Sequence, residues 1–233
     1  MIVSHTIVPL MRYADGEQRP RLRGVMHQVV AYVIPILAIP ILISFPRWPI
    51  ALFLFGKEAS YASSAYLHRA WMTTISIPRQ ECATKVDYCA ICISILSTGI
   101  PHALSHLALY YGVSCSLLLL STLFTLTNWE LPRLVATFAQ LFFAISYIGY
   151  ASRSSWNPIW IAGTVSYAAA FANFGPVATR RGAGKELMDA TMPFIPWHKP
   201  DRNGFHEDFH VMLLLADILY FVNAILYGYN DLV

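Results

Sequence analysis

The stretch "GFHEDFHVMLLLADILYFVNAILYGY", residues 204–229, starts with two histidines four residues apart, His206 and His210, and continues as a long apolar run. About 20 mostly apolar residues are enough to cross a bilayer as a helix. Side chains four residues apart share one helix face, so both imidazoles are expected together at one end of a membrane span. They are either metal ligands or two polar residues at the headgroup boundary.

The composition of the whole chain indicates a membrane protein. Of 233 residues, 56% are hydrophobic and 12% are charged, against roughly 25% charged residues in a typical soluble domain. We expect an all-α seven-helix transmembrane domain at 24–228, between a cytoplasmic segment at 1–23 and a short tail at 229–233. The predicted spans are 24–44, 50–69, 86–107, 110–127, 131–150, 156–174 and 205–227. The long connection from 175 to 204 is expected to be a loop.

The second predicted span is the most polar, because Lys57 and Glu58 lie within it. A charge at membrane depth costs on the order of 3 kcal/mol or more. These side chains are therefore expected to face the protein interior or to lie near an interface.

The distribution of positive charge predicts how the spans are oriented. With seven spans, all of the 16 Lys and Arg residues except Arg47, Lys57 and Arg153 fall on the side that holds the N-terminus. Positive residues accumulate on the cytoplasmic side. The N-terminus is therefore expected in the cytoplasm and the C-terminus outside.

This orientation brings five polar residues to one membrane level. The second span ends with Ser64 and His68, the third begins with Asp87, and the seventh begins with His206 and His210. Three neutral imidazoles leave one position of a tetrahedral Zn²⁺ open for water, whose pKa falls to about 7. The sequence predicts zinc ligands His68, His206 and His210, with Asp87 as proton acceptor and Ser64 hydrogen-bonded to the water or the substrate.

Other readings of the polar residues stay open at this point. Residues 206–210 also match H-E-x-x-H, the signature of helical zinc proteases. His27 lies at the start of the first span, near the predicted zinc site. It either supports the zinc ligands through a hydrogen bond or is hydrogen-bonded to backbone or lipid at the helix end. His102 and His106 lie at the opposite end of the third span, where we expect an interfacial or surface role. Cysteines 89 and 92 form a C-x-x-C pair within an apolar run, which favours packing over metal or redox chemistry.

The order of these motifs resembles the progestin and adipoQ receptor family, which includes the hemolysin III-like proteins. The resemblance is carried by "PRLRGVMHQVVAYVIP" at 20–35, Ser64-x-x-x-His68-Arg69, Asp87 and "GFHEDFH" at 204–210. It implies a seven-helix bundle with zinc near the cytoplasmic side, held by His68 and the seventh-span histidines. Relatives in that family look like zinc-dependent amide hydrolases that act on lipids such as ceramide.

The functional expectation is a zinc-dependent membrane hydrolase that cleaves an amide, or an ester, of a membrane lipid. The alternative from another class is a receptor or membrane-state sensor in which zinc only ties helices together. Either protein would be an integral component of the plasma membrane or an endomembrane, and no nucleic-acid partner is expected.

Overall fold

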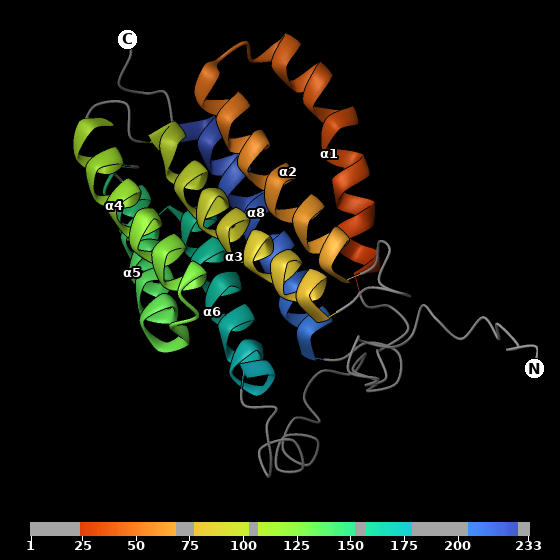
Figure 1. Cartoon of the computed structure of the whole chain (residues 1–233). Helices are drawn as coiled ribbons and strands as arrows, with labels where there is room; N and C mark the ends of the chain where they lie inside the picture. Colours follow the sequence, from red (N-terminus) through yellow and green to blue (C-terminus); the bar gives the residue numbers. More distant parts are fainter. Residues whose placement is uncertain (1–23, 69–76, 103–106, 152–156, 179–204, 228–233) are drawn as a thin grey trace, which may run out of the picture.

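The computed structural model describes residues 24–68, 77–102, 107–151, 157–178 and 205–227 (Figure 1). Within these ranges the chain is entirely helical, with seven α-helices, one short 3-10 helix and no strand. The helices are α1 (Val25–Ser44), α2 (Trp48–His68), α3 (Ile77–Gly99), η1 (Ile100–His102), α4 (Leu107–Leu126), α5 (Glu130–Ala151), α6 (Pro158–Ala178) and α8 (Phe205–Tyr227). The terminal segments and most of the predicted loop at 175–204 lie outside the described residues.

Five stretches within these helices are long and apolar enough to cross a membrane, which confirms the prediction of an all-α membrane protein at this level. They are Val25–Ser44, Glu81–His102, Ala108–Leu126, Leu131–Tyr150 and Phe209–Tyr227. Helices α2 and α6 are not in this set. In α2 the reason is visible in the sequence, since Lys57 and Glu58 interrupt its apolar run.

Helix boundaries differ from the predicted spans mainly at α3 and α6. The third predicted span ends at residue 107, whereas α3 ends at Gly99, η1 ends at His102 and α4 already begins at Leu107. Helix α3 starts at Ile77, well ahead of the predicted residue 86, because hydropathy marks only the apolar part of a helix. The added turns contain Pro78, which suits a first helical turn, and good helix formers such as Gln80 and Glu81. Helix α6 continues to Ala178, so the expectation of a loop from 175 was wrong for its first residues.

The helices pack as neighbouring pairs, α2 with α3, α4 with α5 and α6 with α8, and α1 lies against α2 (Figure 1). The largest apolar core joins residues of α2, α3, α5, α6 and α8. Its buried members are Phe53, Ile95, Leu141, Ala144, Ile148, Tyr167, Ala216 and Tyr220. This core holds the middle of the bundle together and leaves α1 at its edge.

The distribution of polarity suits a lipid environment. Large apolar side chains point outward, including Ile36 of α1, Leu119 of α4 and Phe142 of α5. Polar side chains such as Gln140 and Asn223 are instead fully buried. Soluble monomers rarely expose large contiguous apolar surfaces, whereas in a bilayer the outward side chains contact lipid.

Helix α3 packs tightly against α2 at Gly56. A Cβ atom at this position would overlap the side chain of Ser97. Small residues at helix crossings let backbones approach closely in membrane proteins. The glycine therefore sets the α2–α3 distance one residue before Lys57.

Candidate functional site

Three histidines from three helices gather at one end of the bundle. His27 lies in the first turn of α1, His68 is the last residue of α2, and His210 lies in the second turn of α8. The ring centroids are 4.0 Å apart for His27 and His210, 5.7 Å for His27 and His68, and 6.4 Å for His68 and His210. All three side chains are buried. The fold thus brings together His68 and His210 as predicted.

The position of His27 bears on one question left open by the sequence. Its side chain is only 3% exposed, which argues against the alternative that it contacts lipid. The imidazole instead packs edge-on against His210, at an interplanar angle of 79°. His27 is therefore a component of the histidine cluster.

The cluster has the donors that zinc prefers and nearly the separation that zinc requires. With Zn–N distances of about 2.0–2.1 Å, imidazoles on one tetrahedral zinc have ring centroids about 5 Å apart. The observed separations lie on both sides of that value. However, among the described side chains no group of three His, Cys, Asp or Glu residues is arranged to hold a metal as it stands. The three imidazoles are therefore close together without forming a complete metal site among the described side chains.

The predicted ligand His206 lies in the first turn of α8, one helical turn before His210. Its side chain lies outside the described part of the structure. The full ligand set His68, His206 and His210 therefore stays a prediction.

Asp87 is a buried carboxylate on α3 that is held by two serines of α2. Ser63 Oγ donates a hydrogen bond to Asp87 Oδ1 at 3.1 Å, and the Ser64 side chain also hydrogen-bonds to Asp87. The sequence pointed to Ser64 because it lies one turn before His68, but it missed Ser63. The adjacent serine residues in "YASSAYLH" were the available signal, since α2 and α3 pack against each other.

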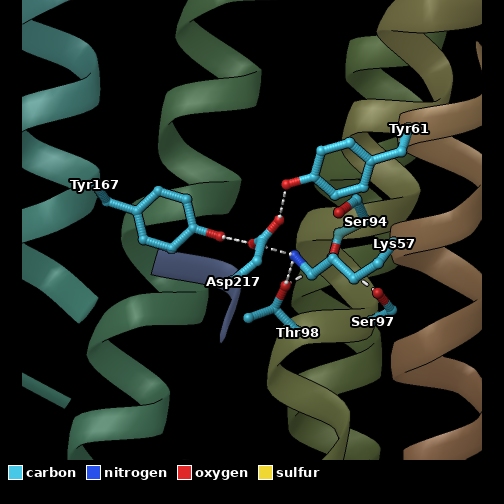
Figure 2. A network of polar contacts seen from close by, with 7 residues as sticks. All are labelled: Lys57, Tyr61, Ser94, Ser97, Thr98, Tyr167 and Asp217. Atoms are coloured by element: carbon cyan, nitrogen blue, oxygen red, sulfur yellow. Dashed lines mark hydrogen bonds and ion pairs between the residues drawn. The ribbon is translucent and has the colours of Figure 1, made fainter. Parts of the chain in front are cut away.

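A second polar centre, which the sequence did not single out, lies deeper in the bundle (Figure 2). Lys57 Nζ is 2.7 Å from Asp217 Oδ1 in a buried ion pair, and it also donates to Thr98 Oγ1 at 2.7 Å. Tyr61 donates to Asp217 Oδ2 at 3.0 Å, and Tyr167 donates to Oδ1 at 2.7 Å. The expectation that Lys57 faces the interior is confirmed.

Asp217 was the residue that sequence reasoning overlooked. It is an acidic residue in the middle of the apolar part of α8, "HVMLLLADILYFVNAILY". An ionisable residue in a membrane span is expected to have a partner, and Lys57 was the corresponding basic residue. The pairing was not deducible because 160 residues separate the two in sequence.

Of the interfacial or surface role expected for His102, the surface alternative was wrong. His102 is 5% exposed, and its Nε2 lies 3.4 Å from Asn223 Nδ2. Asn157 also donates a hydrogen bond to the Asn223 side chain. This cluster ties η1, α6 and α8 together, and His106 lies outside the described residues.

Of the C-x-x-C pair, Cys92 is buried and Cys89 is partly buried, in keeping with the packing role that the sequence favoured. All four cysteines of the chain are free thiols. Cys92 is buried between α3 and α5, where its Sγ lies 3.7 Å from Thr137 Oγ1.

Comparisons with known proteins identify no relative of the chain. No family model, no curated protein and no solved structure matches the chain. The fold and its polar interior define an all-helical membrane protein with a buried histidine cluster. Its function has to be argued from that cluster.

Proposed function

We propose that the chain is a zinc-dependent membrane hydrolase that cleaves an amide, or less favourably an ester, of a membrane lipid. The observation that carries this proposal is the gathering of His27, His68 and His210 from three helices at one end of the bundle. Buried imidazoles from separate helices are suited to a metal. The motifs that resemble the progestin and adipoQ receptor family support the same assignment.

His68, His206 and His210 would hold the zinc, which, when bound, acidifies a water molecule and polarises a carbonyl group. Asp87 accepts a proton in this proposal, and its carboxylate is oriented by the hydroxyls of Ser63 and Ser64. His27 packs against His210 and restricts the rotation of that ring. The surrounding helices exclude bulk water from these groups.

A lipid is proposed as the substrate because the outer surface of the bundle is apolar. Exposed apolar side chains line α1, α4 and α5, which suits a lipid that enters sideways from the bilayer. The proposed topology has seven spans, including α2 and α6, with the N-terminus in the cytoplasm. Its support is the concentration of Lys and Arg at one end of the spans. The protein would reside in the plasma membrane or an endomembrane.

Metal content is the first test. The protein is purified in mild detergent, and bound metals are measured by elemental mass spectrometry for wild type, His68→Ala, His206→Ala and His210→Ala. His102→Ala is the matched control, because His102 is also buried but lies in η1, beyond the end of α3, and Asp87 is about 18 Å from that end along the helix axis. We expect about one zinc per chain in wild type and control, and a loss of zinc in the other variants. Absence of zinc from the wild type contradicts the proposal.

Hydrolysis is tested with Asp87→Asn in liposomes that contain a fluorescent N-acyl sphingolipid. The variant keeps the serine contacts but loses the proton acceptor, so we expect retained zinc and at least a hundredfold lower release of fatty acid. A wild-type protein that binds zinc but hydrolyses no lipid amide or ester would favour the receptor alternative, in which zinc is structural.

A further inference from the structure

The polar centre around Asp217 lies between the two helices that carry His68 and His210. Asp217 belongs to α8, whereas Lys57 and Tyr61 belong to α2 (Figure 2). Helix α2 packs mainly against α3 and α1, and α8 packs mainly against α6. Long polar side chains therefore connect α2 and α8 where their backbones have little direct contact.

The order of contacts along the two helices shows that they run antiparallel. Phe53 packs against Phe221, with ring centroids 5.5 Å apart. Further along α2, Tyr61 bonds Asp217, and at its end His68 lies near His210. Later residues of α2 thus meet earlier residues of α8.

The spacing of these residues links the polar centre to the histidine cluster. His68 follows Tyr61 by seven residues, and His210 precedes Asp217 by seven residues. Seven residues are about two helical turns. His68 therefore lies on the same face of α2 as Tyr61, and His210 on the same face of α8 as Asp217, each about 10 Å further along its helix. Because the helices are antiparallel, both displacements point in the same direction along the bundle.

The geometry points to Asp217, Lys57 and Tyr61 as positioning residues that set the register of α2 against α8 and thereby hold His68 and His210 at one level. This inference rests on the proposed function only where it concerns metal binding. A slip of one helical turn would move one histidine by about 5.4 Å relative to the other. The apolar contact of Phe53 with Phe221 has no directional bond to resist such a slip, whereas the ion pair and the tyrosine hydrogen bond are directional.

The network contains its own control. Tyr167 donates to the same carboxylate as Tyr61 but belongs to α6. Tyr61→Phe removes a link between α2 and α8, whereas Tyr167→Phe removes a link between α6 and α8. If the network only stabilises the fold, both variants have the same effect on the α2–α8 register.

The register is measured by the distance between spin labels at positions 66 and 211, using pulsed electron resonance in a background without native cysteines. Tyr66 and Val211 are exposed residues close to His68 and His210. We expect a broadened or shifted distance distribution, by up to one turn, for Tyr61→Phe and for the charge-free double variant Lys57→Met with Asp217→Leu. Tyr167→Phe is expected to match the wild type.

Metal affinity is the second readout, measured by titration with zinc alone. We expect at least tenfold weaker binding in the double variant and in Tyr61→Phe, and wild-type binding in Tyr167→Phe. Equal effects of the two tyrosine variants on the distance distribution overturn the inference, as does a folded double variant with an unchanged distribution. If the double variant does not fold, the distance distributions of Tyr61→Phe and Tyr167→Phe test the inference by themselves. If the wild type binds no zinc, the proposed function fails, but the spin-label distances still show whether the network sets the register of α2 against α8.

Discussion

The carboxylate of Asp217, which is 13% exposed and paired with Lys57, allows a quantitative prediction about stability. Asp217→Asn keeps the shape of the side chain but only one of the two oxygens that accept hydrogen bonds from Tyr61 and Tyr167. The other tyrosine hydroxyl then faces the new NH₂ group, from which it can accept a hydrogen bond. The substitution removes the negative charge opposite Lys57, whose side chain is 5% exposed. Breaking a buried ion pair by removal of one partner costs about 3–5 kcal/mol, because the other charge is left uncompensated. We expect a loss of about 4 kcal/mol in the free energy of unfolding.

The double variant Lys57→Met with Asp217→Asn separates charge from packing. It leaves no uncompensated charge, and both tyrosine hydroxyls keep a hydrogen-bonding partner in the amide, so we expect a total loss of only about 1 kcal/mol. The double variant is therefore more stable than Asp217→Asn alone, which is a coupling between neighbours that independent sites do not show.

Unfolding is followed by far-ultraviolet circular dichroism in mixed micelles titrated with dodecyl sulfate. Glu81→Gln, which neutralises an exposed carboxylate of α3, is the control and should change the free energy by less than about 0.5 kcal/mol. The reasoning is refuted if Asp217→Asn lowers the free energy of unfolding by less than about 1 kcal/mol. It is also refuted if the loss in the double variant equals the sum of the losses in Lys57→Met and Asp217→Asn measured singly.

Three further predictions concern packing, a helix cap and the lipid-facing surface. Gly56→Ala is expected to destabilise the bundle by about 1–3 kcal/mol, because the new methyl group meets the Ser97 side chain; a gain in stability in the same titration would contradict this contact. Asn157→Ala removes the side-chain oxygen that caps the start of α6 and should cost about 1–2 kcal/mol, whereas Asn157→Ser keeps a cap and should cost less. Ile36→Asp places a charge on the exposed face near the middle of α1 and should raise the apparent free energy of insertion of this segment by about 3 kcal/mol, while Ile43→Asp near the helix end should raise it less; equal effects would argue against α1 as a span.

Hydropathy and helical spacing predicted much of the fold. Apolar runs longer than a bilayer is thick have few structural options, because backbone groups in lipid must bond within their own helix. This is why the apolar helices were predictable, while the polar start of α3 from Ile77 was not. The candidate site was partly predictable for a similar reason, since helical spacing placed Ser64 beside His68 before any contact was known.

Helical spacing within one segment was determined by the sequence alone. It placed His206 and His210 one turn apart in α8, because a helix repeats every 3.6 residues whatever surrounds it. Which residues of different helices meet was decided by the tertiary structure alone. The pairing of Lys57 with Asp217, the burial of His27 against His210 and the burial of His102 beside Asn223 all join residues distant in sequence. Such contacts depend on the rotation and register with which helices pack, and these are settled by the close packing of many side chains together.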